Sequence, residues 1–129
     1  VGNTLKIMEH ALAYAKERQQ FGRPIGKFQA VSHKFAEMQM MYQTARAQTF
    51  RVARMLDAGL DPIMENAVAK AYATEVNWKA ADMAMQILAG AGYILDHDMQ
   101  MMFRDARVGP IGGGTSEIQR NVIAQRMGL

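Results

Sequence analysis

The segment GGGTSE, residues 112–117, has the residue types best suited to binding a ligand. Its consecutive glycines leave their backbone N–H groups unshielded, so a ligand can approach them closely. Thr115 is a favourable N-cap residue, and Glu117 suits the positively polarised first turn of a helix. A helix that begins behind bare amide groups favours an electron-rich oxygen. From this segment alone, an ordinary flexible connector is an equal alternative.

Two other places carry residues that could contact a ligand. Arg18 and Phe21 put a cation and an aromatic ring near the end of an expected helix, and Gln86 precedes Gly90 and Gly92. Arginine also suits a helix C-terminus for electrostatic reasons, and glycine commonly ends a helix. Taken singly, each place is explained as well by capping as by ligand binding.

The sequence lacks the residues that thiol chemistry or a metal site would need. The chain has no Cys, which excludes disulfides, thiolate metal sites and cysteine nucleophiles. His10, His33 and His97 have no partner at the spacing of a metal site. We therefore expect no metal, and we interpret the histidines as surface or loop residues. The 12 Met residues are interpreted as adaptable core filling.

The composition indicates one globular domain. Half of the 129 residues are hydrophobic, and the net charge is only +3, with Lys and Arg scattered along the chain. This pattern argues against a nucleic-acid partner. No apolar run approaches the ~20 residues of a membrane span, and no signal or transit segment is visible. Because position 1 is Val and lies within an expected helix, we expect a fragment of a longer protein.

The elements that must position these residues are predicted to be helices, since no strand alternation is evident. We expect helices over about 2–19, 28–58, 62–89 and 115–127, with a short helical piece over 99–104. Gly and Pro within 21–24 separate the first two helices. Asp61 is expected to cap the third helix, with Pro62 at its first position, and Gly90-Ala91-Gly92 is expected to end it.

Two long helices joined by a tight turn must lie antiparallel. The apolar residues from Val31 to Leu56 alternate steps of 4 and 3, which is typical of a bundle seam. With the first and last helices, the pattern predicts an all-α fold, an antiparallel four-helix bundle over residues 1–129. Some bundles hold a di-iron centre, but the Glu-x-x-His motif that it needs is absent.

Three segments taken together resemble the C-terminal domain of acyl-CoA dehydrogenases. They are YAKERQQFGRPIGKFQAV (14–31), QILAGAGY (86–93) and FRDARVGPIGGGTSEIQR (103–120). They occur in the order and at about the spacing of that family, and the resemblance covers nearly the whole chain. The family's C-terminal domain is a helical bundle, in agreement with the fold expected from periodicity.

The resemblance implies FAD as the cofactor. Arg18 and Phe21 are similar to the pair that reaches across a dimer interface to a neighbour's FAD, and Gln29 matches a second contact to that FAD. Gln86 and Gly90 match the segment that lies along its adenosine and pyrophosphate part. Chemically this is reasonable, because Arg forms charge-assisted hydrogen bonds to pyrophosphate and glycine allows close approach.

The start of the last expected helix also matches a cofactor contact. Thr115, Ser116 and Glu117 resemble the stretch that contacts FAD at that helix start. Ala89 departs from the pattern, since many members have the first Gly of a Gly-Gly pair at this position.

Gly112, Gly113 and Gly114 are implied to lie beside the substrate. Gly112 stands where many members have an aromatic residue, and Gly113 where many straight-chain enzymes carry the catalytic Glu. Isovaleryl-type members also lack that Glu and supply the base from an earlier helix, which would lie upstream of Val1 here. We therefore expect no catalytic side chain in this chain. The Gly113 N–H is expected to donate to the thioester carbonyl.

The implied reaction is oxidation of an acyl-CoA to the 2,3-enoyl-CoA. A carboxylate takes the α-proton while a hydride leaves the β-carbon for flavin N5. The implied partners are the acyl-CoA substrate, an electron-transfer flavoprotein and further copies of the chain in a dimer of dimers. The expected location is the cytoplasm, or the mitochondrial matrix in a eukaryote. An acyl-CoA oxidase of the same fold and a helical assembly module without a flavin role are the alternatives.

Overall fold

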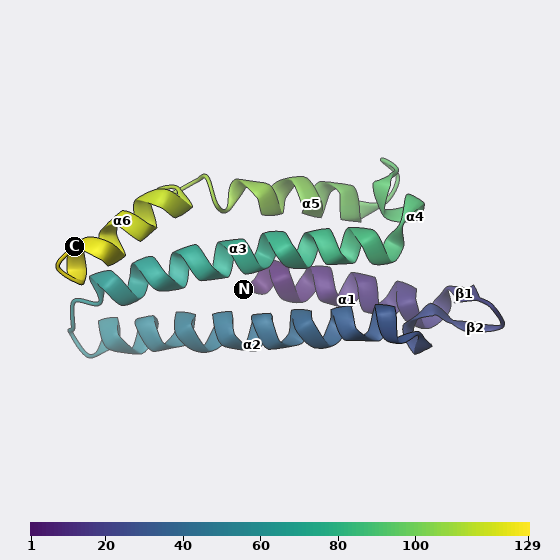
Figure 1. Ribbon diagram of the computed structural model, residues 1–129, viewed down its shortest axis with the longest axis horizontal. Helices are drawn as coiled ribbons and strands as arrows, with labels where there is room; N and C mark the ends of the chain where they lie inside the picture. The colour runs from purple at the N-terminus through teal and green to yellow at the C-terminus, as the bar shows by residue number, and fades with distance from the viewer.

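The computed structural model describes residues 1–129 as a set of helices that run along one long axis (Figure 1). The helices are α1 (Gly2–Glu17), α2 (Gln29–Asp57), α3 (Ile63–Leu88), α4 (Gly90–Tyr93), α5 (Asp98–Val108) and α6 (Ser116–Arg126). Two short strands, β1 (Gln19–Gln20) and β2 (Arg23–Pro24), and a 3₁₀ turn, η1 (Ile25–Lys27), connect α1 to α2. The prediction of an all-α antiparallel bundle is confirmed.

Helix α3 is the centre of the bundle, because α1, α2, α5 and α6 all pack against it. Helices α5 and α6 lie one after the other along α3 and together take the fourth position of the bundle (Figure 1). Small side chains allow neighbouring helices to approach α3 closely. Its buried residues are Ala67, Ala69, Ala71, Val76, Ala80, Ala81, Ala84, Ile87 and Leu88.

The main core lies where α1, α2, α3 and α5 meet. Ile7 of α1, Met38 of α2, Leu88 of α3 and Met99 of α5 are its largest fully buried apolar side chains. The Thr4 hydroxyl donates to the Asn77 side-chain oxygen at 3.1 Å, which gives the α1–α3 contact a polar component. Methionine thus fills part of the core, as expected from its adaptable shape.

A small hairpin follows α1, although the sequence pattern indicated no strand. Gln20 pairs with Arg23, and the two residues between them, Phe21 and Gly22, have φ of 52° and 76°. Positive φ at both central residues is typical of a type I′ turn. Each strand has two residues, too few to show an alternating pattern. The predicted break between the first two helices is confirmed.

The ends of two other helices differ from the prediction. Asp61 does not cap α3, because Pro62 takes a non-helical ψ of 52° and the helix begins at Ile63. Helix α5 is longer than the expected piece over 99–104, since it continues to Val108. At its start, the His97 side chain accepts a hydrogen bond from the Met99 N–H at 3.1 Å.

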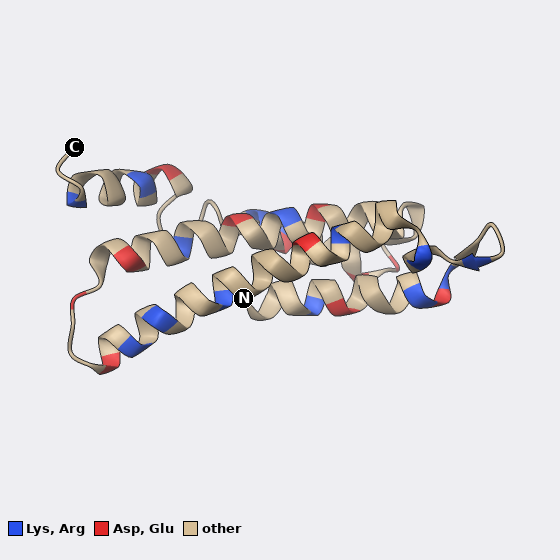
Figure 2. Ribbon diagram, turned by 60° about the horizontal axis from the view of Figure 1, so that its bottom comes forward, with Lys and Arg blue, Asp and Glu red and all other residues tan.

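Charged residues of both signs are interspersed along the helices (Figure 2). None of the helices combines the length and the hydropathy that a membrane crossing requires.

Candidate functional site

The loop between α5 and α6 presents unpaired backbone N–H groups. Gly113 and Gly114 have φ of 65° and 85°. The amides of Gly113, Gly114 and Thr115 donate to no backbone carbonyl, whereas the Gly112 amide donates to the Val108 carbonyl at 2.8 Å. The φ of 85° at Gly114 lies in the region that L side chains rarely adopt, so this turn favours glycine. The loop therefore offers three successive donors to a ligand.

The carbonyl groups of the same loop are bound by side chains of this chain. The Lys70 ammonium, on α3, donates to the Gly109 carbonyl at 3.1 Å and also to the Gly114 carbonyl. The Gln119 side-chain amide lies 3.3 Å from the carbonyl oxygens of both Gly113 and Gly114. Sequence reasoning missed Lys70, because it lies 39 and 44 residues from its partners and no motif marks it.

The first turn of α6 is capped as the sequence predicted. The Thr115 hydroxyl accepts a hydrogen bond from the Ile118 N–H at 3.4 Å. The Ser116 N–H donates to the Pro110 carbonyl at 3.0 Å, which closes the loop on itself. The Ser116 hydroxyl is buried and has no hydrogen-bond partner.

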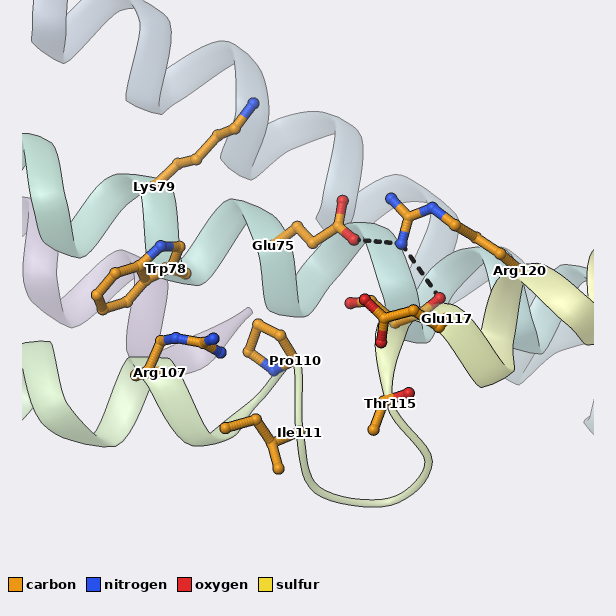
Figure 3. Close-up of a pocket in the computed structure, with 10 residues that line it drawn as sticks. Glu75, Trp78, Lys79, Arg107, Pro110, Ile111, Thr115, Glu117 and Arg120 are labelled. Carbon is orange, nitrogen blue, oxygen red and sulfur yellow. Dashed lines mark hydrogen bonds and ion pairs between the residues drawn. The ribbon is translucent and has the colours of Figure 1, made fainter.

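An ion pair connects α6 to α3 beside the loop. The Arg120 guanidinium lies 2.7 Å from the Glu75 carboxylate and donates to the Ser116 carbonyl at 3.1 Å (Figure 3). Arg120 lowers the pKa of Glu75, chiefly through this hydrogen bond. The pKa of Glu117 is also lowered, because its carboxylate accepts hydrogen bonds from its own backbone N–H and from the Thr115 side chain. Both carboxylates near the loop are therefore weak proton acceptors.

A pocket of about 500 Å³ opens between α3, α5 and α6 on this side of the loop (Figure 3). Trp78 and Arg107 form one wall, with the guanidinium carbon 5.6 Å from the ring centroid. Pro110 and Thr115 belong to the loop, and the Glu75–Arg120 pair stands opposite. The walls carry charges of both signs around an aromatic ring.

A second pocket, of about 360 Å³, lies beside the hairpin at the C-terminal end of α3. Arg18, Phe21, Ile87 and Ala89 line it. Phe21 is 91% exposed, and its ring meets Phe28 edge-on, at 6.1 Å between ring centroids. The hairpin therefore displays an aromatic ring and a cation next to the end of α3.

The remaining predicted residues lie at this same end of the molecule. Gln86 is exposed on the last turn of α3, directly before Ile87 of the second pocket. A Cβ on Gly90 would meet nothing within 4 Å, so the backbone there is open to close approach. Gln29 is exposed at the first position of α2, directly after Phe28 of that pocket.

The structure thus separates the predicted residues into two groups. One group surrounds the hairpin and the end of α3, and the other is the loop at the start of α6. Along α3, Glu75 beside the loop and Gln86 beside the hairpin are separated by about 16 Å, at 1.5 Å per helical residue. Neither of these two pockets is lined by residues of both groups.

Comparison with known proteins identifies the family. Residues 1–128 match the sequence profile of the acyl-CoA dehydrogenase C-terminal domain. The chain belongs to the acyl-CoA dehydrogenase family. A probable acyl-CoA dehydrogenase of Bacillus subtilis, YngJ, is 42% identical over 127 residues, which are 98% of this chain and 33% of that protein.

Solved structures of acyl-CoA dehydrogenase relatives share the fold closely. Butyryl-CoA dehydrogenase from Megasphaera elsdenii superposes with a TM-score of 0.96 at 32% identity, over 99% of this chain and 33% of that one. The FAD complex of PigA superposes with a TM-score of 0.95 at 30% identity, over 99% of this chain and 33% of that one. The chain spans about a third of the length of these relatives.

Proposed function

We propose that this chain forms the C-terminal helical part of an FAD-dependent enzyme that oxidises acyl-CoA to 2,3-enoyl-CoA. The observation that carries the proposal is the loop of unpaired amides at the start of α6, in a chain that belongs to the acyl-CoA dehydrogenase family. Amides aimed at an oxygen stabilise the charge that develops on it during a reaction.

The residues present fit FAD. Arg18 is exposed and takes part in no ion pair within this chain, so its guanidinium is free for a pyrophosphate. The open backbone at Gly90 and the amides of Gly114 and Thr115 leave room for close contact. When bound, FAD supplies the acceptor for the hydride that leaves the β-carbon. The residues of this chain bind the flavin and orient it.

The separation of the two groups supports a shared site between copies of the chain. Gln86, on the hairpin side, lies about 16 Å along α3 from Glu75, which is beside the start of α6. In the proposed assembly, the hairpin of one copy contacts the FAD held beside the loop of its neighbour. The full enzyme is then a dimer or a dimer of dimers.

The Gly113 N–H is proposed to donate to the thioester carbonyl of the substrate. This bond stabilises the enolate-like charge that forms as the α-proton leaves. The proton acceptor is proposed to be a carboxylate N-terminal to Val1. The lowered pKa values of Glu75 and Glu117 support this assignment, because a carboxylate with a low pKa is a poor general base at neutral pH.

The experiment uses the full-length protein that contains this chain. We expect the purified protein to be yellow, and anaerobic addition of acyl-CoA to bleach the flavin absorbance. Electron-transfer flavoprotein, the proposed physiological acceptor, should reoxidise it, whereas rapid reoxidation by oxygen would identify an acyl-CoA oxidase. A colourless protein that takes up no FAD would refute the proposal and favour a helical assembly module.

A further inference from the structure

Lys70 has an unusual environment for a lysine. It is half-buried on α3, and its ammonium takes part in no ion pair. Instead it binds the carbonyls of Gly109 and Gly114, which lie at the two ends of the loop before α6. A half-buried cation with two carbonyl partners and no carboxylate therefore closes this loop against α3.

The loop is packed against α3 at the same place. A Cβ on Gly109 would lie 3.1 Å from the Thr74 Cβ, and Thr74 is one helical turn beyond Lys70. The Thr74 hydroxyl donates to the Lys70 carbonyl at 2.9 Å. The beginning of the loop therefore sits directly on the turn of α3 that carries the ammonium.

Binding of the carbonyls determines where the amides point. In a trans peptide the C=O of one residue and the N–H of the next point in opposite directions. Lys70 holds the Gly114 carbonyl towards α3, which turns the Thr115 N–H away from it. Gln119 holds the Gly113 carbonyl, which turns the Gly114 N–H outward. Gly113 lies between Gly112, whose N–H donates to the Val108 carbonyl at 2.8 Å, and Gly114, whose carbonyl Lys70 binds, so the Gly113 N–H is held from both sides.

We propose that Lys70 is a positioning residue of the acyl-CoA oxidation, and that it acts through the loop Gly109–Gly114. By binding the loop's two terminal carbonyls, it holds the amides of Gly113, Gly114 and Thr115 towards the ligand. Its positive charge also lies behind these donors and favours an oxygen that gains negative charge. The proposal rests on the proposed function, because the thioester carbonyl is the group that the Gly113 N–H would contact.

The test compares full-length wild-type enzyme with Lys70→Met and Lys70→Arg, all reconstituted with FAD. Lys34→Met is the matched control, because Lys34 is a half-buried lysine whose ammonium takes part in no ion pair. One readout is the rate of flavin reduction at saturating acyl-CoA. The other is the infrared stretch of the thioester carbonyl in bound ¹³C-labelled 2-enoyl-CoA, since a hydrogen bond to a carbonyl lowers its frequency.

Lys70→Met should slow flavin reduction roughly 10- to 100-fold, as small misplacements of catalytic groups do. The carbonyl stretch should lose most of the downshift seen in wild type. Lys70→Arg should restore part of both, because a guanidinium can still donate to two carbonyls. Lys34→Met should match wild type.

Three outcomes with the variants would overturn the inference and leave the proposed function standing. A Lys70→Met enzyme with wild-type rate and stretch would show that the ammonium does not position the loop. A slower rate with an unchanged stretch would show a structural role only. If Lys70→Met does not fold, Gln119→Leu takes its place with the same readouts, and wild-type values there would overturn the loop mechanism. A wild-type protein that no acyl-CoA reduces would instead refute the proposed function and, with it, this inference.

Discussion

At the scale of single residues, backbone conformations with positive φ shape both candidate surfaces. Phe21 is the clearest case, with a φ of 52° in a residue whose side chain is almost fully exposed. A bulky residue rarely adopts this conformation, because its Cβ approaches the backbone. The type I′ turn imposes it, and the consequence is an aromatic ring held away from the bundle. Such a ring, next to Arg18, is suited to contact with another molecule.

Arg18→Ala in the full-length enzyme should weaken FAD retention. The guanidinium is free of ion pairs in this chain, and a hydrogen bond to a charged partner contributes roughly 1.5–3 kcal/mol. Flavin content per protein, measured by absorbance after dialysis, gives the result. Arg18→Lys should rescue only part of the loss, since the planar fork is missing. Full flavin occupancy in Arg18→Ala would contradict the assigned role.

Gly113→Glu should restore some turnover to an enzyme whose upstream carboxylate has been removed. A Cβ on Gly113 meets no atom within 4 Å, so the longer side chain has room. The φ of 65° costs a non-glycine residue roughly 1–2 kcal/mol, which the fold can tolerate. The measurement is kcat with acyl-CoA.

Gly113→Gln in the same background is the control, because it has the same size and backbone cost but is not a base. Equal rescue by Gln would argue against proton transfer by the new Glu. Retained activity after loss of every upstream carboxylate would remove the base assignment altogether, and Glu117 would then have to be tested.

At the scale of elements, the long helices and the places where they break were predictable, but the structure of the connections was not. The 4–3 spacing from Val31 to Leu56 predicts a seam, and its members Met38, Ala45 and Val52 are buried. That signal is repeated over many residues. A hairpin with two residues per strand has no room for such a pattern, and the bridge from Lys70 to the loop joins residues that only the tertiary fold brings together.

The candidate site likewise has features that the sequence predicts and features that depend on the tertiary fold. The glycines and the Thr115 cap could be identified from residue type, because their backbone chemistry is local. The Gly112 amide donates to a carbonyl of this chain, whereas the next three amides are unpaired. This difference depends on how α5 ends. Glycine type alone does not carry that information.

The end of α3 should become more stable when Ala89 is replaced by Gly. Ala89 has a φ of 50° and a ψ of −135°, a combination that favours glycine. The strain relieved is of order 1–3 kcal/mol, and the added freedom of glycine in the unfolded chain offsets about 0.5–1 kcal/mol of it. Urea unfolding of the 129-residue chain should therefore show a gain on the order of 1 kcal/mol. Ala91→Gly, within the helical turn α4, should destabilise instead. A loss of stability in Ala89→Gly would contradict the strain argument.

The Glu75–Arg120 pair should make the docking of α6 sensitive to acid. Because the folded pKa of Glu75 is lowered, the stabilisation is complete above the ordinary glutamate pKa of about 4.3. It is lost as the pH falls through the lower folded pKa. The Arg120 and Glu75 side chains are 58% and 35% exposed, so Glu75→Gln should cost only roughly 0.2–1 kcal/mol at pH 7. The measurement is the free energy of unfolding of wild type and of Glu75→Gln, at pH 7 and at a pH below the folded pKa of Glu75. The difference between the two proteins at pH 7 should disappear at the acidic pH. An undiminished difference in acid would rule out the charge as the cause.

At the scale of the whole molecule, the bundle holds two candidate surfaces at different places along α3. One is the hairpin with the end of α3, and the other is the loop at the start of α6. Large apolar side chains are exposed near both, including Phe21 and Tyr93 at one end and Ile111 and Ile118 near the α6 start. Neither surface encloses a ligand, since the pockets there are open hollows between helices. This chain, which spans about a third of its relatives' length, therefore offers two open surfaces rather than a complete ligand-binding site.

The isolated 129-residue chain should bind FAD no more tightly than micromolar and should not oxidise acyl-CoA. Micromolar affinity corresponds to about 8.2 kcal/mol, and a ligand held on one open surface buries little of its area. The hairpin surface and the loop surface of one copy are separate open hollows, and neither encloses a flavin. Quenching of FAD fluorescence during titration with the chain measures the affinity, and the full-length enzyme under the same conditions is the positive control. Submicromolar binding by the isolated chain would mean that a single bundle holds the cofactor, and the shared site between copies would have to be abandoned.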